Sequence, residues 1–178
     1  MTHHSKQLVV VGGGMVARRL VDALRERDTD GRWAITLLCE EPRAPYDRVA
    51  LTSYFSGRDP DDLSLGGAEI WDDPLVTIRR GVAATRVDRE MREVTCSDGR
   101  VLPFDELVLA TGSSAAVPPV PGTDLQGCFV YRTIDDVAAL RQWVEALRER
   151  HDRPLRGAVV GGGLLGLEAA GALQALEV

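Results

Sequence analysis

A glycine-rich turn near the N-terminus constrains the fold of this 178-residue chain more than any other feature. An apolar run at residues 7–11 precedes the turn, and residues 16–24 after it have the spacing of an amphipathic helix. In the pattern Gly12-x-Gly14-x-x-Ala17, the first glycine permits a tight turn and the second lets a pyrophosphate approach the backbone. Phosphates would lie at the helix N-terminus, where free N–H groups favour anions. The pattern therefore predicts a strand, a turn and a helix that bind a dinucleotide.

An acidic residue lies where such a motif needs a ligand for the ribose. The apolar run at residues 35–39 stops at Glu40 and Glu41, which completes a βαβ unit. A carboxylate at this strand end accepts hydrogen bonds from both ribose hydroxyls and repels a 2′-phosphate, so we predict Glu40 as the ribose ligand. Glu41 is a second candidate, although its adjacent position should turn it away from the pocket. The alternatives are a glycine turn without a ligand and a solvated acid at a strand end.

A second glycine motif near the end of the chain repeats this arrangement. Residues 158–160 form an apolar run that predicts a strand, and Gly161-x-Gly163-x-x-Gly166 follows, with Glu168 two residues later. No ribose-binding acid follows within the sequence, so we expect a nucleotide-binding unit that continues beyond Val178. Two such motifs in tandem predict two dinucleotide sites, one for a flavin and one for a nicotinamide.

Between the two motifs, turn and strand signals predict an irregular excursion and a small sheet. Residues 43–67 are polar and proline-rich, with a brief helical pattern at 49–55. Asp98-Gly99 is a hairpin signal. We expect an antiparallel piece from the runs at residues 76–79, 84–87, 93–96 and 101–102.

The region before the second motif combines a strand, a proline-rich connection and a helix. Residues 106–110 predict a buried strand, and residues 118–122 (PPVPG) predict a connection between domains. Thr133 and Asp136 have the spacing of a capping box. The helix that they begin would bury Val137, Leu140, Val144 and Leu147.

Composition excludes several classes of function. The net charge of −6 offers no basic surface for nucleic acid or an anionic membrane. No apolar run approaches the roughly 20 residues of a membrane-spanning helix, and residues 1–7 contain no signal-peptide pattern, so a cytoplasmic location is expected. The three cysteines, Cys39, Cys96 and Cys128, have no metal-binding or redox spacing. We therefore expect no metal site.

The segment at residues 107–113 (LVLATGS), the Pro-Gly behind it and the tandem glycine motifs resemble the FAD/NAD(P)-linked reductases of the glutathione-reductase-like fold. Four further stretches resemble the large subunit of assimilatory NAD(P)H nitrite reductases; they lie at residues 39–43, 46–49, 129–136 and 161–170. The resemblance covers residue 7 to the end of the chain. It implies an α/β fold with an FAD-binding Rossmann domain and a small antiparallel segment at residues 1–152. The truncated beginning of an NAD(P)-binding Rossmann domain would then occupy residues 153–178.

The resemblance also implies which residues contact the two cofactors. For FAD these are Gly12, Gly14, Met15 and Val16 at the pyrophosphate, Glu40 at the ribose, Ala84 near the adenine, and Arg48, Thr111, Gly112 and Arg132 along the cofactor. For NAD(P)H they are Gly161, Gly163, Gly166 and Glu168. The two arginines could equally be exposed surface residues. No side chain is expected to be a catalytic acid or base, because the chemistry would belong to the cofactors.

The implied function is that of an FAD-dependent NAD(P)H oxidoreductase. Electrons would pass from NAD(P)H through FAD to an iron–sulfur cluster and sirohaem in later domains, or to a small redox subunit, and would reduce nitrite to ammonia. The chain alone would then turn over neither substrate. Residues 49–55 contain no cysteine, which excludes a disulfide relay, and the chain has Thr52-Ser53 where related ferredoxin reductases often have a lysine. The alternatives are a ferredoxin or rubredoxin reductase and a non-catalytic nucleotide sensor.

Overall fold

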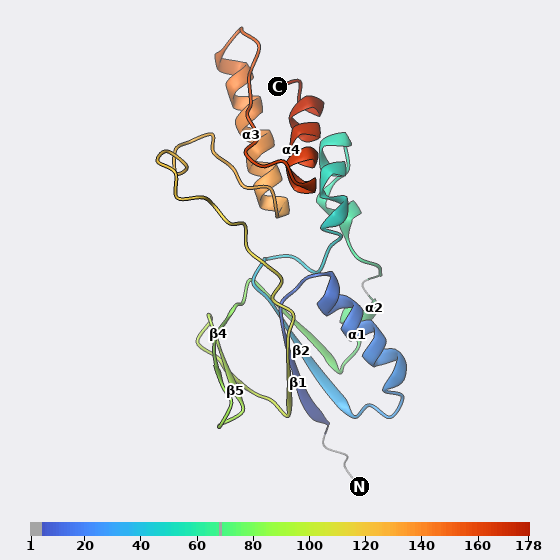
Figure 1. Cartoon of the computed structure of the whole chain (residues 1–178). Helices are drawn as coiled ribbons and strands as arrows, with labels where there is room; N and C mark the ends of the chain where they lie inside the picture. The colour runs from blue at the N-terminus through green and yellow to red at the C-terminus, as the bar shows by residue number, and fades with distance from the viewer. Residues whose placement is uncertain (1–4, 68) are drawn as a thin grey trace. The chain divides into compact units, whose positions relative to one another are not determined.

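The computed structural model describes residues 5–67 and 69–178, and residues 1–4, which contributed to the expectation of a cytoplasmic location, lie outside it. The chain divides into two compact units (Figure 1). The first unit consists of Met1–Tyr46 and Ser64–Gly112, and the second consists of Asp47–Leu63 and Ser113–Val178. These units are compact packing units, and their bounds differ from the boundary expected at residue 152. That boundary separates the expected FAD-binding and NAD(P)-binding domains, and it stays a prediction.

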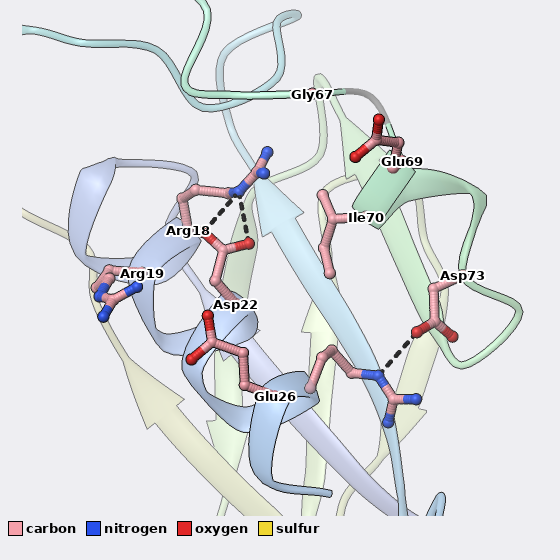
Figure 2. Close-up of a pocket in the computed structure, with 9 residues that line it drawn as sticks. Arg18, Arg19, Asp22, Glu26, Gly67, Glu69, Ile70 and Asp73 are labelled. Carbon is pink, nitrogen blue, oxygen red and sulfur yellow. Dashed lines mark hydrogen bonds and ion pairs between the residues drawn. The ribbon is translucent and has the colours of Figure 1, made fainter. Parts of the chain in front are cut away.

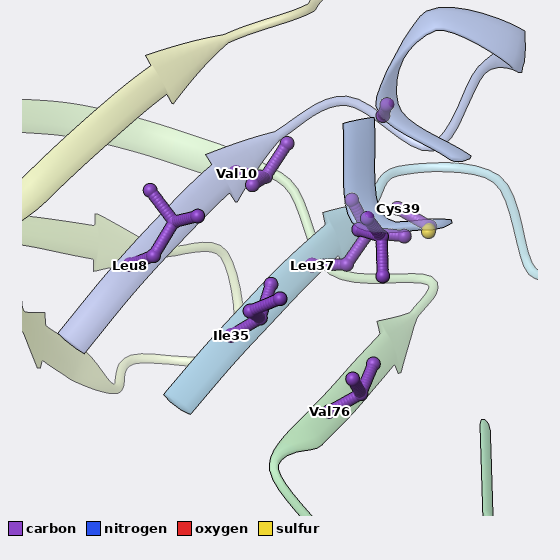
Figure 3. Close-up of a cluster of buried hydrophobic side chains, with 8 residues drawn as sticks. Leu8, Val10, Ile35, Leu37, Cys39 and Val76 are labelled. Atoms are coloured by element: carbon purple, nitrogen blue, oxygen red, sulfur yellow. The ribbon is translucent and has the colours of Figure 1, made fainter. Parts of the chain in front are cut away.

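A four-stranded parallel sheet forms the centre of the first unit. Its strands are β1 (Lys6–Val11), β2 (Trp33–Cys39), β3 (Val76–Arg80) and β7 (Glu106–Leu109), in the spatial order β3-β2-β1-β7. Helix α1 (Met15–Arg27) joins β1 to β2, as the sequence predicts. Alternate strand residues face α1, and they form a core with Ala17 and Val21 of that helix (Figure 3). That core also contains Leu8, Val10, Ile35, Leu37, Cys39 and Val76.

The strand β3 corrects the sequence prediction. Residues 76–79 were expected in the antiparallel piece, but they pair in parallel with β2, with Val76 opposite Ile35. Val76 is buried in the core beneath α1. A short apolar run does not reveal its partner, and here the burial of Val76 against β2 decides the pairing. The short helix α2 (Glu69–Asp72) precedes this strand.

The expected antiparallel sheet consists of the three other strands. These are β4 (Ala84–Asp88), β5 (Glu93–Cys96) and β6 (Val101–Pro103), in that spatial order. The hairpin turn at Gly99 has a φ of 82°, which the sequence signal at Asp98-Gly99 anticipates. Val94 and Cys96 of β5 pack with Val9, Val11 and Leu38 on the other face of the parallel sheet. The small sheet therefore belongs to the core of the first unit.

The second unit is helical in its described residues. It contains the 3-10 helices η1 (Val49–Ser56) and η2 (Pro60–Leu63) and the longer helices α3 (Ile134–Arg150) and α4 (Leu164–Ala175). Thr133 and Asp136 form the predicted capping box of α3. Residues 118–122 form neither helix nor strand, as expected. The strand predicted at residues 158–160 is absent from this described region, because no other strand of the unit is there to pair with it.

The turn between β1 and α1 packs tightly against two neighbouring strand ends. Gly12 has a φ of +118°, and a Cβ added there would lie 2.1 Å from the carbonyl oxygen of Ala110. A Cβ on Gly13 would lie 2.5 Å from Sγ of Cys39, whereas one on Gly14 would meet no atom within 4 Å. The close packing therefore requires glycine at the first two positions but leaves the third open.

We expect Gly12→Ala to lower the free energy of unfolding by on the order of 2 kcal/mol or more, because the side chain would strain φ and collide with backbone. Gly14→Ala is the matched control and should cost about 1 kcal/mol or less, since it changes only a helix N-cap. Urea denaturation followed by circular dichroism measures both. An equal loss in the two variants would show that the contact with Ala110 does not govern stability.

Candidate nucleotide-binding site

The candidate residues of the first unit lie at one edge of the parallel sheet. Parallel strands have their carboxyl ends at the same edge, and β1, β2 and β7 are followed there by Gly12, Glu40 and Thr111. Strand β1 lies between β2, to which α1 connects it, and β7 on the other side. Ligands of open α/β sheets bind outside the carboxyl ends at such a change of direction. The fold therefore brings the predicted residues of this unit to the appropriate edge.

The N-terminus of α1 is open and has no acidic side chain in its first turn. Gly14 is the N-cap without a side-chain hydrogen bond, and the first helical bond runs from Arg18 N to the Gly14 carbonyl oxygen at 3.0 Å. Met15 and Val16 are exposed. The N–H groups of this turn are therefore available to an anion, and a Cβ on Gly14 would meet no atom within 4 Å. These residues fit a dinucleotide pyrophosphate.

Glu40 lies beside this turn, immediately after Cys39, whose side chain contacts Gly13. Its exposed carboxylate makes no hydrogen bond or ion pair with the described residues. The Val82 N–H donates to the Cys39 carbonyl oxygen at 2.9 Å, so the segment that leads to Ala84 runs alongside the strand end. A free carboxylate next to an open helix N-terminus fits a ribose ligand.

Glu41 differs from its neighbour in its contacts. The hydroxyl of the buried Tyr46 donates to Glu41 Oε2 at 2.8 Å. Thr111 and Gly112 are exposed, and the Thr111 backbone nitrogen would lie 3.0 Å from a Cβ on Gly12. Glu41 is thus held within the protein, whereas the segment at Thr111 borders the glycine turn.

The remaining candidates belong to the second unit. Arg48 Nη1 donates to the Arg132 carbonyl oxygen at 2.8 Å, so these two residues are neighbours. The second glycine turn has the geometry of the first: Gly161 has a φ of +123°, and Gly163 is the N-cap of α4. A Cβ on Gly166 would lie 2.1 Å from the Gly161 carbonyl oxygen. The exposed helix N-terminus again offers N–H groups to an anion.

Glu168 ends a hydrogen-bonded chain that the sequence does not predict. Tyr131 Oη donates to Thr52 Oγ1 at 3.0 Å, and Thr52 Oγ1 donates to Glu168 Oε2 at 3.4 Å. The Tyr131 ring also stacks on Phe55 at 6.2 Å between centroids. Burial raises the pKa of Tyr131, the bond to Thr52 opposes this shift, and the charge of Glu168 adds to it. Because Thr52 and Glu168 are 116 positions apart, no local spacing could have indicated the contact.

A separate surface depression of about 380 Å³ lies along the side of α1 and does not include the glycine turn (Figure 2). Two of its arginines are paired with acids: Arg18 Nε lies 2.9 Å from Asp22, and Arg25 Nε lies 2.8 Å from Asp73. Arg18 also stacks on the ring of Trp71. These pairs support the fold, so we do not assign the depression to a nucleotide.

Two features are absent from residues 5–67 and 69–178. No helix in this part of the chain is long and apolar enough to cross a membrane. Within the same residues, no group of three or more His, Cys, Asp or Glu could hold a metal ion.

The sheet, the glycine turn at its carboxyl edge and the open helix N-terminus define a dinucleotide-binding α/β protein of the predicted fold class. Residues 6–178 match the model of the family described as pyridine nucleotide-disulphide oxidoreductase. The chain belongs to this family.

Individual relatives agree with this assignment. The chain is 42% identical over 172 residues to the nitrite reductase (NADH) large subunit of Escherichia coli (strain K12). The aligned segment covers 97% of this chain and 20% of that protein. The chain thus spans about a fifth of the length of this curated relative. A ferredoxin reductase from Rhodopseudomonas palustris, known from a crystal structure, has 28% sequence identity to this chain and a TM-score of 0.78. The match covers 96% of this chain and 40% of the reductase chain. Reduced Bacillus anthracis CoADR-RHD shares the fold, with a TM-score of 0.84 and 21% sequence identity. The match covers 98% of this chain and 32% of the CoADR-RHD chain.

We expect Glu168→Gln to lower the pKa of Tyr131, because the substitution removes a negative charge that disfavours the phenolate. Thr52→Val should instead raise that pKa, because it removes the hydrogen bond that favours the phenolate. Ultraviolet absorbance titration measures phenolate formation, and Tyr131→Phe assigns the transition among the three tyrosines. Shifts in the same direction in the two variants would contradict the hydrogen-bonded chain.

Proposed function

We propose that the chain is the FAD-binding part, with the beginning of the NAD(P)H-binding part, of an oxidoreductase that reduces nitrite. The observation that carries this proposal is the 42% identity to a nitrite reductase large subunit over nearly the whole chain. The open helix N-terminus and the free Glu40 carboxylate support the FAD site. Electron acceptors of the iron–sulfur and sirohaem type would lie outside these 178 residues, in further domains or in a small redox subunit.

The residues of the first unit would bind and orient the flavin cofactor. N–H groups at Gly14, Met15 and Val16 would donate to the pyrophosphate, and Glu40 would accept from the ribose hydroxyls. The backbone at Thr111 and the segment before Ala84 would border the rest of the cofactor. Bound FAD would supply the capacity to accept a hydride from NAD(P)H and to release electrons singly.

The residues of the second unit would serve the nicotinamide cofactor and, at Arg48 and Arg132, the flavin. The turn from Gly161 to Gly166 would hold the NAD(P)H pyrophosphate at the N-terminus of α4. Glu168 would lie at the same site, oriented by Thr52 and Tyr131. Arg48 and Arg132, which are neighbours, would contribute positive charge along the flavin.

A second candidate function is that of a ferredoxin reductase, which passes electrons to a separate carrier protein. The similarity to the ferredoxin reductase from Rhodopseudomonas palustris favours it. The chain is also 36% identical to the ferredoxin–NAD(+) reductase component of an anthranilate 1,2-dioxygenase system from Burkholderia cepacia, with 40% of that protein covered. Both candidate functions use the same two cofactor sites.

The complete protein that contains this chain should show a flavin absorbance spectrum and should consume NADH or NADPH when nitrite is added. Ammonium formed in proportion to nitrite consumed would support the proposal. NAD(P)H oxidation with ferredoxin or rubredoxin but not with nitrite would favour the second candidate. A protein without flavin, or one that oxidises NAD(P)H with none of these acceptors, would rule out both.

We predict that Glu40→Ala weakens FAD binding roughly 10- to 150-fold, because one lost hydrogen bond to a charged acceptor is worth about 1.5 to 3 kcal/mol. Quenching of flavin fluorescence during titration of the apoprotein measures the dissociation constant. Glu41→Gln is the matched control, because it changes the charge of the adjacent acid but keeps an acceptor for Tyr46. Wild-type affinity in Glu40→Ala, or an equal loss in the control, would show that Glu40 is not the ribose ligand.

A further inference from the structure

The hydrogen bond between Tyr46 and Glu41 joins the β2 strand end to a buried tyrosine. Tyr46 is only 5% exposed, and its hydroxyl donates to Glu41 Oε2 at 2.8 Å. The Tyr46 backbone is itself fixed, because it forms an antiparallel bridge with Ser64, and the Leu65 N–H donates to the Pro45 carbonyl oxygen. Glu41 is therefore hydrogen-bonded to a buried tyrosine whose own backbone is paired within the first unit.

The backbone on both sides of Glu40 is fixed by other contacts. The Gly81 N–H donates to the Glu41 carbonyl oxygen at 3.0 Å, and the Val82 N–H donates to the Cys39 carbonyl oxygen at 2.9 Å. The Cys39 side chain is packed against Gly13 in the glycine turn. Glu40 is thus an exposed residue whose carboxylate has no partner among the described residues, and the backbone of both its neighbours is held by hydrogen bonds.

The neighbouring acids have opposite environments, which suggests a division of roles. Glu41 is half-buried and accepts the bond from Tyr46, whereas Glu40 is exposed and has no bond within the described residues. A ligand group binds more tightly when its backbone is ordered before binding, because less conformational freedom is lost on association. The bond between Tyr46 and Glu41 supplies such order next to Glu40.

We propose that Tyr46 and Glu41 are positioning residues that hold Glu40 in place for the ribose of the bound dinucleotide. This inference rests on the proposed function, in which Glu40 binds FAD. Glu41 then serves the cofactor through the backbone of residues 39–41 and makes no contact with it. Tyr46, which the sequence does not single out as a site residue, joins the site in the same way.

The test is a double-mutant cycle on FAD affinity, measured with the complete protein. Tyr46→Phe keeps the buried ring but removes the hydroxyl, and we expect FAD to bind roughly 3- to 10-fold more weakly. In the Glu40→Ala background the same substitution should change affinity less than about twofold, because the residue through which it acts is gone. Tyr54→Phe controls for the loss of a tyrosine hydroxyl elsewhere and should bind FAD like wild type.

Amide hydrogen exchange without flavin gives an independent readout. Tyr46→Phe should accelerate exchange at the amides of Gly81 and Val82, which donate to the carbonyl oxygens of Glu41 and Cys39. Full FAD affinity in Tyr46→Phe, or an equal loss in the Glu40→Ala background, would overturn the positioning role and leave the proposed function standing. Absence of FAD binding by the wild-type protein would overturn the proposed function, and this inference with it.

Discussion

The contact between Gly12 and the Ala110 carbonyl is the constraint on which the first unit depends. A Cβ at Gly12 would lie 2.1 Å from that oxygen, so only a residue without a side chain lets the turn after β1 approach the end of β7. The same approach places Gly13 against Cys39 at the end of β2. Three strand ends and the N-terminus of α1 are thereby gathered at one place. The packing that stabilises the sheet and the geometry that offers N–H groups to a phosphate have the same cause.

The candidate FAD site on the first unit combines backbone donors with the carboxylate of Glu40, which has no partner among the described residues. Glu40 and Glu41 are chemically identical neighbours, yet only Glu41 is held by a buried hydroxyl. The difference follows from what surrounds the strand end, since Tyr46 is fixed by its bridge to Ser64. An acid that is already bonded within the protein has little to gain from a ligand, whereas an exposed acid on an ordered backbone loses little entropy on binding. The structure thus gives different environments to two residues that the sequence could distinguish only by position.

Local patterns in the sequence predicted the first glycine turn, the capping box at Thr133 and the hairpin at Gly99, because each depends on residues only a few positions apart. Pairings between distant segments were not accessible in this way. Residues 76–79 joined the parallel sheet, because burial against β2 outweighed the nearby hairpin signals. Residues 158–160 formed no strand in the described unit, since apolar character alone provides no partner for the backbone. The chain from Tyr131 through Thr52 to Glu168 joins three separate segments, and no spacing rule covers it.

A comparison of the two glycine turns shows which features of the candidate site depend on the local motif and which depend on the neighbouring strands. Gly161 has the same left-handed conformation as Gly12, although a Cβ there would meet nothing within 4 Å and the described part of its unit has no strand. The turn and the open helix N-terminus are therefore encoded by the glycines and by the helix that follows. Neighbouring strands add something else, namely an acid at the next strand end and a backbone segment such as that at Thr111. If the proposed function holds, phosphate binding would depend on the turn, whereas discrimination among dinucleotides would require the sheet, because the sheet places the proposed ribose ligand Glu40 beside the turn.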